Sequence, residues 1–272
     1  MTVLGAGRNP AALESVVLSL DEMQFLLEEL QIDDVPVVLD AIGRYDNAAE
    51  HDAALAAAAD SLTERALLTD GEVHPELADR LRTLNRPHWV VALRLVVEGR
   101  VSRLCLAKGD DLVTVALRGP NSYVLDEVAE DLSAPLLAAL GPAEPLDLTG
   151  MNAYTDDLVP IFGELGDAAA TARRLAAVGT PDRDAQALAS ALVHLEAHAE
   201  IVGVAYRDGT REYADNHIAV FDTRNGRFLA TASRADDGSK WTSLSSGTPA
   251  RLRAALLDLV NGLPERDEFP VR

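Results

Sequence analysis

The sequence predicts an α+β protein with a central antiparallel sheet, built from two related units that each run helix, four strands, helix. Three turn dipeptides indicate the antiparallel pairing, because Asp208-Gly209, Asn225-Gly226 and Asp237-Gly238 tolerate the positive φ angles of tight hairpin turns. Short segments rich in β-branched and aromatic residues surround these turns, and we expect strands at 201–206, 217–221, 228–233 and 241–244. Thr248 then caps a closing helix that has Pro249 at its first position.

The beginning of the chain predicts a strand and two helices. A strand is expected over residues 14–20, and a helix over residues 21–30, where apolar residues recur at helical spacing. Asn47 is expected to cap a long alanine-rich helix that runs from Ala48 to about Leu67. Gly71 follows as a turn signal.

The first complete unit of helix, four strands and helix is expected over residues 75–141. Leu77, Leu81 and Leu84 form a helical stripe that ends just before Pro87. The elements expected after it are strands at 89–97, 101–108, 112–118 and 122–125, and a helix opened by Ser133 and Pro135 that ends at Gly141.

The same leucine stripe recurs later in the chain and predicts an internal repeat. Leu188, Leu192 and Leu195 follow the first three leucines at a constant offset of 111 residues. We therefore expect a second unit over residues 184–263, related to the first by a pseudo-twofold axis, within a single domain of residues 1–272. Two sheets joined along an edge leave fewer exposed strand edges.

Glycine and proline mark the segments between and after the units. Residues 142–180 are expected to be a loop-rich connector with one helix at about 167–178, and its part from 143 to 164 is expected to be mobile. The end, residues 264–272, alternates charge with proline and is expected to be a frayed tail.

Charge and cysteine content restrict the class of protein. The net charge of −20 and the pI of about 4.6 disfavour nucleic acid and anionic membrane surfaces as partners, because both require clustered Lys and Arg. The single cysteine, Cys105, cannot form an intrachain disulfide and is expected to be a buried thiol. No signal peptide and no membrane-spanning run are apparent, so we expect a cytoplasmic protein.

Residues that suggest catalysis are sparse. His194 and His198 lie four apart in a predicted helix and would present two imidazoles to a metal, but Leu195 stands where a zincin helix has its glutamate. A structural or surface role is the better interpretation of the pair. Phosphate-binding loops and nucleophile elbows are absent from the sequence. We therefore expect no enzyme, no cofactor and no metal site.

Several stretches of the second unit resemble the EspG family of ESX (type VII) secretion-associated proteins. They are AEIVGVAYRDG at 199–209, IAVFDT at 218–223 with Gly226-Arg227, and DGSKWTS at 237–243. In the first unit, RALL at 65–68, Gly71 and the segments 75–86 and 89–97 are similar to the family's run into its central strands. The resemblance covers residues 16–263 and rests on fold motifs.

The resemblance implies a cytosolic chaperone that binds the helical tip of a PPE protein in a PE-PPE heterodimer and keeps it soluble for secretion. It implies no reaction and no cofactor. It also implies helical bundles at both ends of the sheet, and a groove between the sheet and the C-terminal bundle, which we place on residues 228–233, 241–245 and the helix expected at 184–198. The partner-binding residues expected from this placement are Arg227, Leu229, Thr231, Ser233, Trp241, Ser243, Leu192 and Leu195.

The choice of sheet face rests on side-chain chemistry. Thr231 and Ser233 are unusual for a dry core, so their face is preferred to the one carrying Phe228 and Ala230. Two alternatives to the chaperone remain open: a non-enzymatic binding module for another secreted helical protein, and, more distantly, a metal-dependent enzyme using the histidine pair.

Overall fold

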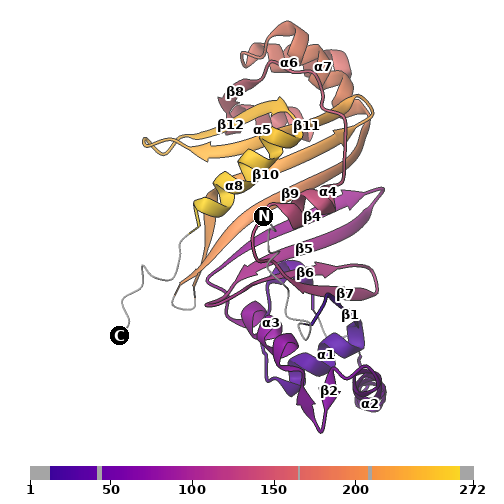
Figure 1. Ribbon diagram of the computed structural model, residues 1–272. Coiled ribbons are helices and arrows are strands. Elements are labelled where there is room, and N and C mark those ends of the chain that lie inside the picture. The colour runs from indigo at the N-terminus through magenta and orange to yellow at the C-terminus, as the bar shows by residue number, and fades with distance from the viewer. Residues whose placement is uncertain (1–12, 42–44, 165, 208–209, 264–272) are drawn as a thin grey trace, which may run out of the picture. The chain divides into compact units, whose positions relative to one another are not determined.

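The computed structural model describes residues 13–41, 45–164, 166–207 and 210–263 (Figure 1). It is an α+β fold with eight α-helices and an antiparallel ten-stranded sheet among these residues, as predicted. The strand order is β1-β7-β6-β5-β4-β9-β10-β11-β12-β8, and β2 and β3 form a separate hairpin. The chain divides into two compact units, and the terms first unit and second unit refer to these from here on. The first has residues 1–87 and 105–129, and the second has residues 88–104 and 130–272. The two related segments of the sequence, 75–141 and 184–263, are called the first and second repeat.

The first unit contains the N-terminal helices and the strands beside them. Its elements are β1 (Val16–Ser19), α1 (Leu20–Glu29), the 3-10 helix η1 (Val37–Leu39), α2 (Ala48–Glu64), β2 (Leu68–Thr69), β3 (Glu72–Val73), α3 (Pro75–Asn85), β6 (Val113–Arg118) and β7 (Ser122–Glu127). β5 (Arg100–Lys108) begins in the second unit and ends in the first. Asn47 caps α2 as predicted, and its side chain accepts a hydrogen bond from the Ala49 N–H at 2.9 Å.

A buried carboxylate joins α1 to α2 in the first unit. Ser19 and Glu22 form a capping box, in which the Ser19 N–H donates to Glu22 Oε2 at 2.7 Å and Ser19 Oγ accepts from the Glu22 N–H at 3.1 Å. Glu22 Oε1 accepts hydrogen bonds from Ser61 Oγ at 2.8 Å and from Arg65 Nη1 at 2.9 Å. Burial alone raises the pKa of Glu22, but the hydrogen bonds from Ser19 and Ser61 and the charge of Arg65 outweigh it and lower the pKa below its usual value.

Protonation of Glu22 is expected to weaken the first unit. Because the folded-state pKa is lowered, the carboxylate stabilises the fold above its ordinary pKa of 4.5, and this contribution is lost as the pH falls through the folded-state pKa. The Glu22→Gln variant is therefore expected to melt below the wild type at pH 7, and the difference is expected to shrink when melting is repeated at about pH 4. Glu29→Gln, an exposed change on the same helix, is the control; an equal difference at both pH values contradicts the prediction.

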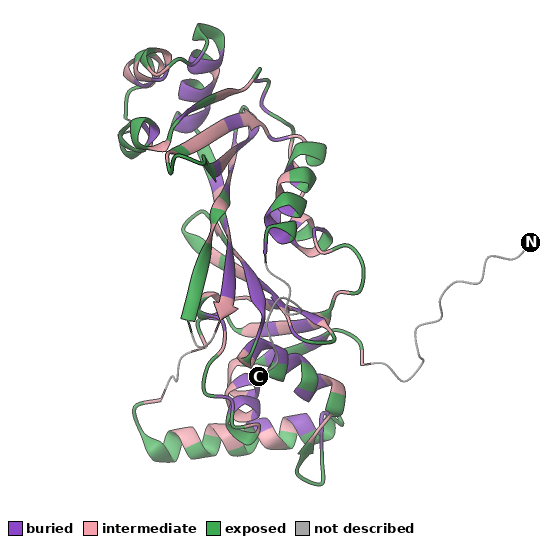
Figure 2. Ribbon diagram, turned by 90° about the vertical axis from the view of Figure 1, so that its left-hand side faces the viewer, coloured by how far each residue is buried: buried purple, intermediate pink, exposed green. Residues whose placement is uncertain are grey.

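The second unit contains the remaining strands and helices. Its elements are β4 (Trp89–Val97), α4 (Ala134–Leu140), β8 (Met151–Tyr154), α5 (Thr155–Gly163), α6 (Ala168–Ala177), α7 (Asp182–Val193), β9 (Leu195–Arg207), β10 (Thr210–Thr223), β11 (Gly226–Arg234), β12 (Lys240–Ser246) and α8 (Pro249–Asn261). In chain order, α3, β4–β7 and α4 repeat as α7, β9–β12 and α8, which is the predicted order of helix, four strands and helix. Buried residues follow the strands and the inner sides of the helices (Figure 2).

The local turn and cap signals of the second unit are confirmed where the structure describes them. Gly226 and Gly238 have φ angles of 126° and 84°, at the turns between β10 and β11 and between β11 and β12. Thr248 Oγ1 accepts a hydrogen bond from the Arg251 N–H at 3.3 Å and Pro249 begins α8. Asp208-Gly209 and the tail 264–272 lie outside the described residues.

The helix predicted at 184–198 is shorter than expected. α7 ends at Val193, His194 is its C-cap, and β9 begins at Leu195. Leu195 pairs with Thr223 of β10, and Ala197 pairs with Val97 of β4, so pairing on both sides extends the strand into the end of the leucine stripe. Leu195 is accordingly 38% exposed, whereas Leu84, its counterpart in the first repeat, is fully buried.

The prediction of a loop-rich connector between the two repeats was wrong for residues 151–163, which form β8 and α5. β8 pairs with β12, and the buried Asp184 fixes the chain just before it, since Asp184 Oδ2 accepts from Thr149 N–H at 2.9 Å and from Gly150 N–H at 3.1 Å. α5 tolerates Pro160 inside its nine residues while burying Leu158 and Ile161. A proline that usually breaks helices therefore gave a misleading signal.

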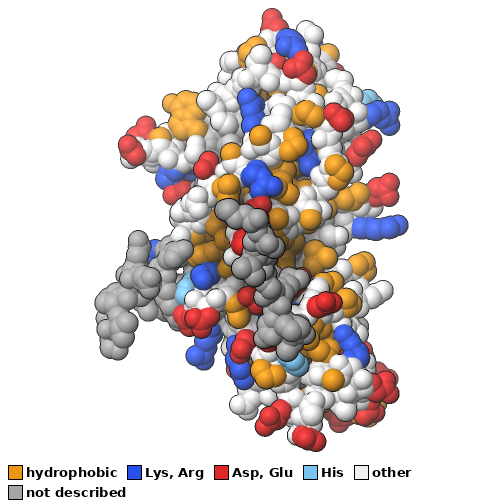
Figure 3. All heavy atoms as spheres, viewed as in Figure 1, with side chains coloured by type: hydrophobic (Ala, Val, Ile, Leu, Met, Phe, Trp, Pro, Cys, Tyr) orange, Lys and Arg blue, Asp and Glu red, His pale blue; other side chains and the backbone are white. Residues whose placement is uncertain are grey.

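The surface agrees with the charge count. Acidic and basic side chains are interspersed on the face shown in Figure 3, and the chain has 44 acidic and 24 basic residues. No helix among the described residues is long and apolar enough to cross a membrane.

Candidate functional site

Strands β11 and β12 present two chemically different faces. In the register, Leu229, Thr231 and Ser233 of β11 lie opposite Ser245, Ser243 and Trp241 of β12, and these six side chains share one face. The other face carries Phe228 and Leu244, both fully buried against α5, α6 and α7. Each face contributes to a separate depression in the second unit.

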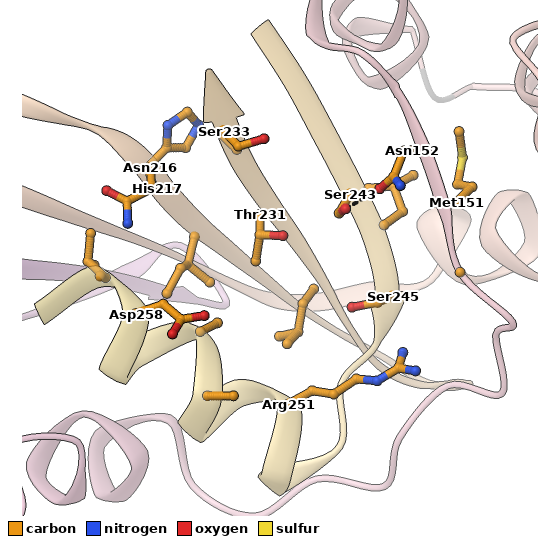
Figure 4. A pocket seen from close by; sticks show the side chains of 18 of the residues that line it. Met151, Asn152, Asn216, His217, Thr231, Ser233, Ser243, Ser245, Arg251 and Asp258 are labelled. Carbon is orange, nitrogen blue, oxygen red and sulfur yellow. Dashed lines mark hydrogen bonds between the residues drawn. The ribbon is translucent and has the colours of Figure 1, made fainter. Parts of the chain in front are cut away.

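The first depression, which we call the polar groove, lies between α8 and the hydroxyl-bearing face of the sheet (Figure 4). Its volume is about 690 Å³. The floor consists of Thr231, Ser233, Ser243 and Ser245, and the α8 wall consists of Arg251, Ala254, Ala255 and Asp258. Asn152 of β8 lies opposite Ser243 and accepts a hydrogen bond from its hydroxyl. The groove can therefore donate and accept hydrogen bonds along its floor.

The second depression, which we call the apolar cleft, lies on the opposite face and has a volume of about 340 Å³. Side chains from six elements line it: Thr155, Leu158, Val159 and Phe162 of α5, Leu192 of α7, Leu195 and His198 of β9, Phe221 of β10, Ala230 of β11 and Thr242 of β12. Val159 is 62% exposed. Exposed apolar side chains gathered in a concave site are typical of protein-binding surfaces.

Three stacked aromatic rings support the apolar cleft. Phe221 stacks on Phe228 with ring centroids 4.7 Å apart, and Phe162 stacks on Phe221 with centroids 5.9 Å apart. Phe228 is fully buried. The stack ties α5 to β10 and β11, so the wall and the floor of the cleft share one core.

The structure distributes the eight predicted partner-binding residues over different places. Leu229, Thr231, Ser233 and Ser243 line the polar groove, and Leu192 and Leu195 line the apolar cleft on the other face. The predicted groove combined the first face with the helix of Leu192, and this combination was wrong because α7 packs against the face of Phe228 and Leu244. Trp241 lies beside the polar groove, half-buried, with its ring centroid 4.1 Å from that of Tyr154.

Arg227, the eighth residue, is buried. Its guanidinium donates to both carboxylate oxygens of Asp222, at 2.5 and 2.7 Å, and to the carbonyls of Leu140 and Gly141, both at 2.9 Å. Only 4% of the residue is exposed. Arg227 therefore anchors the C-terminal end of α4, and four of its five N–H donors are used within the protein.

The catalytic candidates do not assemble into a site. His194 caps α7 and His198 lies in β9, so the two imidazoles do not share a helical face. Among the described residues, no group of three or more His, Cys, Asp or Glu side chains is placed to hold a metal ion. Cys105 is buried in β5 as predicted, and burial raises the pKa of its thiol.

The sequence interpretation missed the residues of α5 that line the apolar cleft. Leu158, Val159, Ile161 and Phe162 recur at the spacing of a helix, and that periodicity was available in the sequence. Pro160 in their midst favoured a loop instead. Arg251 and Asp258 of the polar groove were also missed, because only the packing of α8 on the sheet shows which flank of the helix faces the floor.

The architecture defines the class of protein as an α+β fold, in which one antiparallel sheet has a depression on each of its two faces. A model of the EspG family matches residues 19–258. The chain therefore belongs to the EspG family.

Similar proteins extend this result along nearly the whole chain. The ESX-3 secretion-associated protein EspG3 of Mycobacterium tuberculosis (strain CDC 1551 / Oshkosh) is 26% identical over 288 residues, which cover 96% of this chain and 95% of the relative. EspG3 of Mycolicibacterium smegmatis is 26% identical over 266 residues, with 94% and 89% covered. The solved M. tuberculosis type VII secretion system chaperone EspG5, in complex with the PE25-PPE41 dimer, has a TM-score of 0.77 at 17% identity, with 92% of this chain and 97% of EspG5 covered.

Proposed function

We propose that this protein is a cytosolic, non-enzymatic chaperone that binds the helical tip of a PPE protein in a PE-PPE heterodimer and keeps it soluble for type VII secretion. Membership of the EspG family and the similarity to EspG5, which was solved with a PE-PPE dimer, support this role. The apolar cleft is the proposed docking site. Leu192 and Leu195 remain partner-binding residues in this proposal, and Val159 and Phe162 join them.

The exposed apolar lining of the cleft is the observation that supports the proposal most. An apolar helical tip aggregates when it is exposed, and a helix-in-groove contact protects it by burying its apolar residues at i, i+3 and i+4 spacing. Val159 and Leu195 are exposed by 62% and 38%, and they flank the cleft from α5 and β9. Burial of such side chains contributes roughly 25 cal/mol per Å² of apolar area removed from water.

Co-expression with PE-PPE pairs encoded by the same organism tests the proposal. The wild-type protein is expected to co-elute with one pair in size-exclusion chromatography, and Val159→Asp is expected to raise the Kd at least about tenfold, because it places a charge in an apolar contact. The matched control is Val37→Asp, since Val37 is 73% exposed and lies in the other unit. Failure to co-elute with every pair, or equal binding by the two variants, contradicts the proposal.

A further inference from the structure

The polar groove lies where the helical layer on one face of the sheet stops. α8 packs on β9 and β10, and beside it the face of β11, β12 and β8 forms the floor of the groove (Figure 4). Thr231, Ser243 and Ser245 are half-buried there and line the groove. On the opposite face the same strands are covered by α5 and α7.

The floor of the polar groove, formed by one face of β11, β12 and β8, has the width of one helix. It spans three strands, and two strand spacings of about 4.8 Å give about 10 Å, which is the diameter of a helix with its side chains. The main-chain groups of β11 are already paired with β12, and those of β12 with β8. An occupant of the floor is therefore recognised by side chains and cannot be added as another strand.

The flank of α8 has the pattern of a helix-packing surface. Arg251, Ala254, Ala255 and Asp258 follow one another at i, i+3, i+4 and i+7, so they form one stripe along the groove. The two alanines at its centre permit a second helix to approach to about 8–10 Å between axes. Arg251 and Asp258 lie at the two ends of the stripe and take part in no ion pair within the described part of the chain.

We propose that the polar groove is a second docking site, which takes one helix of a partner protein alongside α8. The contact face of that helix carries small, hydroxyl or amide side chains that match Thr231, Ser243 and Asn152. A carboxylate lies opposite Arg251 and a lysine or arginine opposite Asp258, about 10 Å apart along the helix axis. This site goes beyond the proposed chaperone function, because the apolar cleft lies on the other face of the same strands.

Two stapled helical peptides provide the probe. Both have an alanine and serine contact face with one Glu and one Lys seven residues apart; one has Glu before Lys and the other Lys before Glu, since a helix can lie in either direction beside α8. Fluorescence anisotropy is expected to show that the wild-type protein prefers one peptide. The Arg251→Glu, Asp258→Lys double variant is expected to bind that peptide at least about tenfold more weakly and to prefer the other one.

The control and the second measurement keep the test specific. Arg94→Glu changes an exposed arginine of β4 outside the groove and is expected to leave the preference unchanged. Amide shifts of Thr231 and Ser243 in NMR spectra report contact with the floor. Binding of neither peptide below about 1 mM, or a preference that survives the double charge exchange, overturns the proposal. Co-elution of the double variant with the PE-PPE pair is measured separately, so failure here leaves the apolar cleft untouched.

Discussion

Replacing Arg227 by alanine is expected to lower the free energy of unfolding by about 3–5 kcal/mol, which is typical of breaking a buried ion pair from one side. The Arg227 side chain is 5% exposed and the Asp222 side chain 22% exposed, so each charge depends on the other for its stabilisation. The variant also leaves the carbonyls of Leu140 and Gly141, at the end of α4, without their donors. Urea unfolding followed by circular dichroism measures the loss.

Arg234 on the same strand is the matched control for Arg227. Its guanidinium donates to Asp215 at 2.7 Å, but the side chain is 43% exposed. Arg234→Ala is therefore expected to lower the free energy of unfolding by less than about 1 kcal/mol. Equal losses in the two variants would show that burial of the Arg227 network contributes little.

A glycine makes the position of Arg227 possible. A Cβ at Gly247 would lie 2.3 Å from Arg227 Cγ and 2.7 Å from its carbonyl oxygen, which also accepts the Gly247 N–H at 2.9 Å. The backbone of the loop after β12 thus packs directly on the arginine stem. This close approach explains why the arginine is enclosed although its sequence neighbours suggest an exposed strand position.

The features predicted correctly from the sequence are those that short-range chemistry determines. Asn225-Gly226 and Asp237-Gly238 specify hairpins through φ angles that few residues adopt, and Thr248-Pro249 specifies a helix start. The order of helices and strands in both repeats follows from such signals. Each is complete within a few residues, so no knowledge of distant contacts was needed.

The errors occur where distant pairing decides the structure. Leu195 continues a leucine stripe, yet pairing of β9 with its neighbours draws it into a strand. Arg227 lies two residues before Leu229 on β11, so both were expected on one face of the sheet. Arg227 is instead buried in an ion pair with Asp222 and in hydrogen bonds to the end of α4, more than 80 residues away in the sequence. Six of the eight predicted partner-binding residues therefore line one of the two depressions, Trp241 lies beside the polar groove and Arg227 is buried. Their role in binding stays a prediction.

The second large effect is expected for Phe228→Ala, which removes the buried ring beneath the apolar cleft. Phe228 is fully buried, and its ring stacks on that of Phe221, which in turn stacks on Phe162. Loss of a buried phenylalanine costs about 3–5 kcal/mol, through lost transfer free energy and the cavity that remains. The free energy of unfolding measured in urea is expected to fall by that amount.

Phe228 also separates stability from binding in the apolar cleft. Phe228→Leu fills most of the cavity and is expected to cost less than Phe228→Ala, while Tyr213→Ala, at a residue 71% exposed, is expected to stay within about 0.5 kcal/mol of the wild type. Because the ring of Phe221 loses its support, Phe228→Ala is also expected to weaken PE-PPE binding under conditions where it remains folded. Full stability of Phe228→Ala would contradict the packing argument, and undiminished binding by the folded variant would show that the cleft does not depend on the aromatic stack.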